Sequence, residues 1–192
     1  MAHSPSVARR SDAILVLVDL QERLSAAMAN RANVLAAVNR LLSVAALTGV
    51  PVVVTRQYPD GLGDVEPVLR SAIEAASSSI DVSWADKVAF DCFAEPSFAE
   101  QIAALGRKQL IIAGMETHIC VTQTALSGVR GGYDAHVVGD ACCSRDATTH
   151  ELALSRMRHA GATVTCTESV LYELVGAAGS GEFRELLRIV KA

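Results

Sequence analysis

The sequence has few aromatic side chains, no long apolar run and no excess of positive charge. Aromatic residues make up 4% of the 192 residues, and the formal net charge is -4 at pH 7. Without a basic excess nothing attracts the chain to nucleic acid or to an anionic membrane, so we expect neither partner. The longest apolar stretch, Leu41–Val54, is interrupted by polar residues, Gly and Pro, and is too short to cross a bilayer.

Cysteine patterns that form disulfides or bind metals are also missing. The number of cysteines is odd and no two have C-x-x-C spacing, so neither a disulfide framework nor a zinc site is predicted. The first ten residues lack the apolar segment of a secretory signal. We therefore expect a reduced, cytoplasmic protein without a metal or another cofactor. The five cysteines are Cys92, Cys120, Cys142, Cys143 and Cys166.

What the sequence does contain is a regular alternation of β-branched apolar runs and amphipathic stretches. Continuous apolar runs are typical of strands that are buried on both faces of a sheet. No linker divides the chain, so we predict a flexible N-terminal tail at 1–10 and one domain at 11–192. The candidate strands are Ala13–Val18, Pro51–Thr55, a short one near Asp86–Ala89, Gln109–Ala113, Ala135–Val138 and Ala162–Cys166.

The amphipathic stretches between these strands have recognisable ends. One helix is expected to stop at Gly49, because glycine is the usual C-terminal cap. Capping boxes at 97–100 and 148–151 predict two further helix starts, and a last helix is expected near Glu182–Val190. Strands that alternate with helices imply parallel pairing and right-handed crossovers. The predicted fold is therefore an α/β, Rossmann-like three-layer αβα sandwich with a mostly parallel sheet.

Three chemically active side chains are expected to meet at one edge of this sheet. Ligands of open α/β sheets bind outside the carboxyl ends of the strands. Asp19 follows the first strand, Lys87 belongs to the third, and Cys120 comes shortly after the fourth. The three side chains can therefore converge although they are far apart in the sequence.

Cys120 is the candidate nucleophile. It lies about one turn into a predicted helix, where free N–H groups favour a thiolate, and a nearby lysine would lower the thiol pKa further. We therefore expect a Cys120 pKa below that of an ordinary thiol. Asp19 can take the thiol proton and return it to a leaving group, while N–H groups of the turn hold an oxyanion. Each residue also has an ordinary structural interpretation: Cys120 as a small buried side chain, Asp19 as a helix cap and Lys87 as a solvated charge.

Several segments together resemble one family. Asp19-x-Gln21, Lys87-x-x-Phe90 and the stretch Gly114-Met-Glu-Thr-His-Ile-Cys120-Val121 are similar to the isochorismatase-like cysteine hydrolase superfamily. The motifs recur in order over nearly the whole chain, and the closest resemblance is to isochorismatase-domain-containing hydrolases. Further similar segments are Gln57–Gly63, Asp140–Arg145 and Thr167–Val175.

The resemblance implies a fold and a mechanism. It implies a six-stranded parallel sheet and an Asp-Lys-Cys triad, which here is Asp19, Lys87 and Cys120. It also implies an oxyanion hole made by the backbone N–H groups of Glu116 and Cys120, with a cis peptide between Met115 and Glu116. The implied reaction is hydrolysis of a small-molecule amide or similar C–N bond through a thioester acyl-enzyme.

Three departures from family patterns narrow this function. Nicotinamidases carry an Asp-x-His metal motif after the second strand, whereas this chain has Thr55-Arg-Gln-Tyr58. Metal-assisted nicotinamide hydrolysis is therefore not expected. True isochorismatases lack the nucleophilic cysteine, so Cys120 argues against vinyl-ether hydrolysis. Leu24 replaces a phenylalanine that is common three residues after the motif glutamine.

The remaining expectations concern the substrate pocket, the oligomeric state and the alternative functions. Gln57, Tyr58, Phe90 and His118 are candidates for the substrate pocket, which would take a small molecule. Because the chain is rich in apolar residues and the family commonly assembles, a homo-oligomer, a dimer or larger, is expected. The alternatives are a catalytically silent binding or scaffold protein, and a thiol redox protein that pairs Cys120 with a resolving cysteine.

Overall fold

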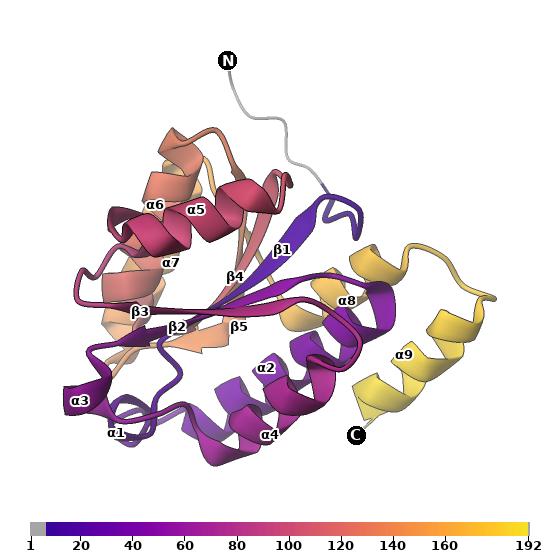
Figure 1. Ribbon diagram of the computed structural model, residues 1–192, viewed down its shortest axis with the longest axis horizontal. Coiled ribbons are helices and arrows are strands. Elements are labelled where there is room, and N and C mark those ends of the chain that lie inside the picture. Colours follow the sequence, from indigo (N-terminus) through magenta and orange to yellow (C-terminus); the bar gives the residue numbers. More distant parts are fainter. Residues whose placement is uncertain (1–6, 192) are drawn as a thin grey trace.

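The computed structural model describes residues 7–191 and contains one six-stranded sheet with helices on both faces (Figure 1). Every neighbouring pair of strands is parallel, in the order β3-β2-β1-β4-β5-β6. The predicted three-layer sandwich is confirmed, and its sheet is parallel throughout. The strands are β1 (Ala13–Val18), β2 (Val52–Gln57), β3 (Val82–Lys87), β4 (Gln109–Met115), β5 (Asp134–Cys143) and β6 (Thr163–Thr165).

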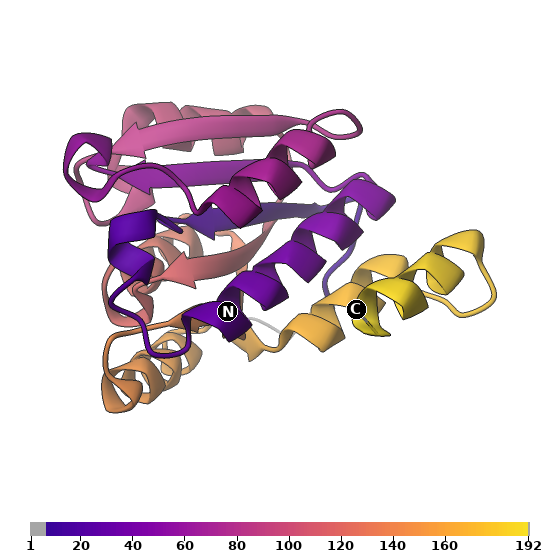
Figure 2. The same cartoon turned by 90° about the horizontal axis from the view of Figure 1, so that it is seen from below.

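Two helical layers cover the sheet (Figures 1 and 2). Helices α2, α4, α8 and α9 lie over one face and α5, α6 and α7 over the other. Leu15 and Leu17 of β1 point into the first apolar core, whereas Ile14, Val16 and Val18 point into the second. The helices are α1 (Glu22–Ser25), α2 (Arg31–Thr48), α3 (Pro59–Leu62), α4 (Pro67–Ala76), α5 (Pro96–Ala104), α6 (Thr122–Arg130), α7 (Ala147–His159), α8 (Thr167–Val175) and α9 (Gly181–Lys191), with a 3-10 turn η1 (Cys92–Ala94) and a π-helical turn η2 (Thr117–Val121).

Two strands differ most from their predicted bounds. The third was expected near Asp86–Ala89, but β3 ends at Lys87 and begins at Val82. It is an edge strand that is only partly buried, so it lacks the continuous apolar run that marks a central strand. The fifth continues past Val138 to Cys143 and pairs with Met115 after a register shift in β4.

The predicted helix ends are partly right. Gly49 caps α2 in the left-handed conformation with φ 74°, as expected. The two capping boxes are wrong, because α5 begins at Pro96 without a side-chain cap and α7 is capped by Asp146. The Asp146 carboxylate accepts the Thr149 N–H at 2.9 Å, two residues before the position of the predicted cap.

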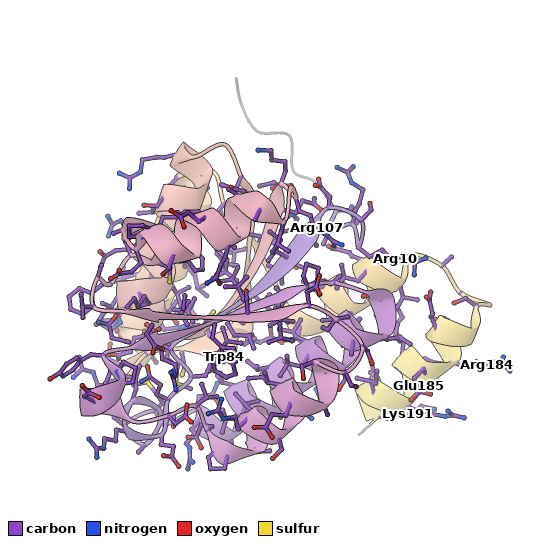
Figure 3. All side chains as sticks on the ribbon, viewed as in Figure 1. Arg10, Trp84, Arg107, Arg184, Glu185 and Lys191 are labelled. Carbon is purple, nitrogen blue, oxygen red and sulfur yellow. The ribbon has the colours of Figure 1, made fainter. Side chains whose placement is uncertain are left out.

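A polar clasp joins β2 to the edge strand β3 on the face opposite Lys87. Arg56 and Asp86 are register partners and form two hydrogen bonds, of 2.7 and 2.9 Å. Trp84, labelled in Figure 3, lies on the same face of β3 as Asp86, and the Arg70 guanidinium stacks 4.8 Å from its ring centre. The clasp therefore holds the edge strand by charge and stacking rather than by burial.

The described part of the N-terminal segment packs against the C-terminal helices. Residues 1–6 of the predicted tail lie outside the described residues. Ala8 is buried and its N–H donates to Glu173 at 2.8 Å. Arg10 lies beside the last two helices in Figure 3 and pairs with Glu182 at 2.8 Å. Within residues 7–191 no helix is both long and apolar enough to cross a membrane.

Gly114 allows β1 and β4 to approach each other at the edge where the candidate site lies. Its φ is +135°, and a Cβ built there would lie 2.0 Å from the Val18 carbonyl oxygen. This contact is with backbone, so it cannot be relieved by a side-chain rotation. The residues that follow, Asp19 and the η2 turn, depend on this close pairing.

Substituting Gly114→Ala should therefore lower the free energy of unfolding by roughly 3 kcal/mol or more, or prevent folding. The matched control is Gly132→Ala, which also has a positive φ (+80°) but open space at the Cβ position. That change should cost only about 1–2 kcal/mol. Urea unfolding followed by circular dichroism compares the two, and equal losses would contradict the close-approach argument.

Candidate active site

A buried ion pair between Asp19 and Lys87 lies at the centre of the candidate site. Asp19 follows β1 with a positive φ of 52°, and Lys87 is the last residue of β3. Lys87 Nζ lies 2.6 Å from Asp19 Oδ2, and the two side chains are 1% and 0% exposed. The second carboxylate oxygen, Oδ1, accepts the Thr55 hydroxyl at 2.7 Å. The sheet therefore brings together two of the three predicted catalytic side chains, as expected from the strand ends.

Gln57 holds the Lys87 ammonium from the neighbouring strand. Its Oε1 accepts from Lys87 Nζ at 2.6 Å, while its Nε2 donates to the Val88 carbonyl at 2.7 Å and so fixes the amide orientation. Burial alone would lower the pKa of Lys87, but the Asp19 charge, the nearby thiols and the Asp19 hydrogen bond raise it above the ordinary value. Lys87 therefore stays charged at neutral pH.

Gln21 connects the loops that follow β1 and β2. Its Nε2 donates to the carbonyls of Gln57 and Gly63 at 3.0 and 2.7 Å, and its Oε1 accepts the Gln57 N–H at 2.7 Å. All its polar atoms are used within the fold. The glutamine of the Asp-x-Gln motif thus positions the strand ends.

Cys120 lies in the η2 turn and is 5% exposed. Its thiol pKa is raised, first by burial and then by the Asp19 charge, while Lys87 opposes the rise and a hydrogen bond with Asp19 adds to it. The expected lowering of this pKa is therefore wrong. The reason is that Lys87 is neutralised by Asp19, so the carboxylate and the apolar surroundings dominate.

Cys92 is a second thiol beside the pair, and we did not predict it. It is fully buried, and its Sγ lies 3.9 Å from the same Thr55 hydroxyl that donates to Asp19. Burial, followed by the Asp19 charge, raises the pKa of Cys92 to about 12. Nothing in its sequence context marks it, because it lies in the short η1 turn after β3 rather than at a strand end.

The turn that carries Cys120 begins at Glu116. The peptide between Met115 and Glu116 is cis, as the resemblance implies. The Glu116 carboxylate is nearly buried and accepts both the N–H and the Nε of Arg145, at 2.9 and 3.1 Å. The oxyanion role of the Glu116 and Cys120 N–H groups stays a prediction.

The four predicted pocket residues have different surroundings. Gln57 is buried against Lys87, whereas Tyr58 and Phe90 are 55% and 54% exposed. His118 is half-buried, with its Nδ1 2.9 Å from the Ser144 hydroxyl. It lines a cavity of about 220 Å³ between η2 and α7, and no triad residue is among the side chains that line it.

The position of the nicotinamidase metal motif is occupied by other interactions. Arg56 is bound to Asp86 and Gln57 to Lys87, so both side chains at the end of β2 are engaged. Across residues 7–191 there is no group of three or more His, Cys, Asp or Glu side chains placed to share a metal ion. Leu24 is partly buried against the core that α2 covers.

Comparison with known proteins decides the family. Residues 13–169 match the isochorismatase domain family. This chain belongs to the isochorismatase family. Its relative in Phytophthora sojae, the secreted isochorismatase effector Isc1, is 34% identical over 180 residues, which cover 93% of this chain and 84% of that protein.

Two solved structures share the fold over almost the whole chain. The MAR1 ribonuclease of Caenorhabditis elegans is 28% identical, with 97% of this chain and 93% of that chain covered and a TM-score of 0.88. The YcaC gene product of Escherichia coli, described as an octameric hydrolase of unknown specificity, is 27% identical, with 98% and 89% covered and a TM-score of 0.82.

Two variants should move the titration of Cys120 in opposite directions. Asp19→Asn removes a negative charge and should lower the thiol pKa, whereas Lys87→Met removes the opposing positive charge and should raise it. Each shift should be about one unit or more, because one unit corresponds to ~1.4 kcal/mol. The rate of iodoacetamide labelling at Cys120 against pH, read by peptide mass spectrometry, measures both. Lys191→Met, on the remote helix α9, should leave the profile unchanged, and shifts of equal sign in the two site variants would contradict the assignment.

Proposed function

We propose that this chain is a metal-independent hydrolase in which Cys120 attacks a small-molecule amide or similar C–N bond. The observation that carries the proposal is the buried 2.6 Å pair of Asp19 and Lys87, with Cys120 close enough for both charges to act on its thiol. Removing two charges from water costs several kcal/mol per ion, so such a pair is poor evidence for stability. Its presence is therefore better explained by chemistry than by a silent scaffold.

The raised thiol pKa determines when the Cys120 thiol loses its proton relative to its attack on the substrate. A thiol that is protonated at neutral pH needs a base, and Asp19 is the carboxylate within hydrogen-bond reach. Proton transfer from Sγ to Asp19 therefore accompanies attack on the carbonyl carbon rather than preceding it. Lys87 holds the carboxylate in place and offsets the charge that develops on sulfur.

The remaining steps use the same groups. The backbone N–H groups of Glu116 and Cys120 stabilise the oxyanion of the tetrahedral intermediate. Asp19 then gives its proton to the leaving nitrogen, the C–N bond breaks, and a thioester remains on Cys120. Asp19 next takes a proton from water, which attacks the thioester carbonyl. The C–S bond breaks, the carboxylic acid leaves, and Asp19 returns its proton to the Cys120 sulfur.

Other parts of the proposal concern cofactors, partners and location. The reaction uses no metal or other cofactor, because Arg56 and Gln57, which stand where nicotinamidases have the metal motif, bind Asp86 and Lys87. The net charge of -4 does not favour binding to nucleic acid. All five cysteines are free, which suits the reducing cytoplasm. The redox alternative would need a disulfide between Cys120 and another cysteine.

A screen of small amides, ureides and carbamates, with intact-mass detection, tests the function. At least one compound should acylate Cys120, and Cys120→Ser should reduce turnover by roughly 10³-fold or more because a hydroxyl is a far weaker nucleophile. Cys166→Ser, at an exposed thiol, is the matched control and should keep full activity. Turnover that depends on a chelator-sensitive metal, or that survives Cys120→Ser, would contradict the proposal, and an RNA substrate should remain uncleaved.

The chain should also form a homo-oligomer, as a dimer or larger. Tyr58, Val88 and Phe90 are large exposed apolar side chains after the ends of β2 and β3, and Leu152 is another on α7. Exposed apolar groups of this size commonly mark an assembly surface. Light scattering at micromolar concentration measures the mass, and a particle with the mass of one chain would refute the expectation.

A further inference from the structure

A second cavity adjoins the nucleophile turn on the side away from Lys87. Its volume is about 230 Å³, and it lies between the start of α2, the end of β5 and the first turn of α7. It is smaller than the pockets of 300–1,000 Å³ that take drug-sized ligands, so it suits a group of few atoms. The described residues that line it are Ala29, Asn30, Cys142, Cys143, Ser144, Arg145, Ala147 and His150.

The cavity shares a wall with the turn that carries Cys120. Three successive residues of that turn are bonded to three residues that line the cavity. Glu116 binds Arg145 at 3.1 Å, the Thr117 hydroxyl lies 2.9 Å from His150 Nδ1, and His118 Nδ1 lies 2.9 Å from the Ser144 hydroxyl. A molecule in the cavity is therefore held by groups whose positions are coupled to the nucleophile.

Arg145 has the geometry of an anchored receptor for an anion. Its Nε and backbone N–H are both bound to Glu116, which fixes the plane of the guanidinium. Its two Nη groups have no hydrogen-bond acceptor among residues 7–191, and its side chain is 62% exposed. A planar guanidinium with free terminal N–H groups matches a carboxylate, which it can bind through two parallel hydrogen bonds.

The other polar groups of the cavity are compatible with an anion. No side chain that lines it within the described residues is acidic. The Asn30 Oδ1 accepts from Asn33 at 2.7 Å, which leaves the Asn30 amide N–H groups as donors toward a ligand. Burial lowers the pKa of His150, more than the nearby Glu151 raises it, so the ring is neutral at pH 7 and Arg145 is the charge that selects the ligand.

We propose that this cavity binds the carboxylate of the substrate, so that the substrate class is a small amide with a second, anionic end. Arg145 holds the carboxylate on one side of the η2 turn, and the amide end of the substrate extends from the cavity toward Cys120. This proposal rests on the proposed hydrolase function, since it assigns the substrate of the same nucleophile.

Matched amides test the charge preference. Malonamate, succinamate and glutaramate each carry a carboxylate, and malonamide, succinamide and glutaramide are their neutral counterparts of similar size. At least one charged member should show a kcat/KM at least tenfold above its neutral partner. Arg145→Gln should raise the KM of that member by roughly 10- to 100-fold, as expected for a charge-assisted hydrogen bond, and the ratio of its kcat/KM to that of its neutral partner should fall toward one.

Two controls separate this proposal from folding and from the function. Arg158→Gln, an exposed arginine further along α7, should leave the charge preference intact, and melting temperatures exclude unfolding of Arg145→Gln. If no charged amide is favoured, or if the preference survives Arg145→Gln, the carboxylate site is refuted. Acylation of Cys120 by neutral amides alone would refute it while leaving the hydrolase function standing. Preferential binding of a charged amide without any acyl adduct would instead refute the hydrolase.

Discussion

The site depends on one ion pair that the fold completely encloses. Asp19 and Lys87 come from the ends of two strands that are separated by β2, and each is held on its other side by a group from β2. Thr55 binds the carboxylate and Gln57 binds the ammonium, so β2 acts as a spacer that fixes their distance. The three-strand arrangement leaves neither charge without a partner, which a buried charge requires.

The same pair explains the state of the nucleophile. A lysine that was free to face Cys120 would favour a thiolate, but this lysine already has a carboxylate, an amide oxygen and a backbone carbonyl around it. The thiol therefore stays protonated in the resting site, and the chemistry is driven by a base rather than by a preformed thiolate. A protonated thiol is also less prone to oxidation and to capture by stray electrophiles.

The sequence predicted the sheet and the meeting of Asp19, Lys87 and Cys120, because buried apolar runs mark parallel strands and such strands end at one edge. It did not predict the contacts that come from side chains crossing between elements. Thr55 and Cys92 carry no periodic or motif signal. The bond between Glu116 and Arg145 joins the segments that follow β4 and β5, and β5 is longer than the apolar run from which it was predicted. The thiol pKa was mispredicted because burial of Cys120 and the Asp19 charge outweigh the effect of Lys87, which is already paired with that carboxylate.

The clasp between Arg56 and Asp86 has a consequence for the chemistry at Lys87. Side chains alternate along a strand, so a slip of β3 by a single residue would turn Lys87 to the opposite helical layer and bring Asp86 toward Asp19. Edge strands are the ones most free to slip, since they have a partner on one side only. The bonds from Arg56 to Asp86 and the stacking of Arg70 on Trp84, on the face of the sheet that α4 covers, hold β3 in register and so keep the Lys87 ammonium beside the Asp19 carboxylate on the other face. The clasp therefore helps to fix the geometry of the buried pair although it lies on the opposite face of the sheet.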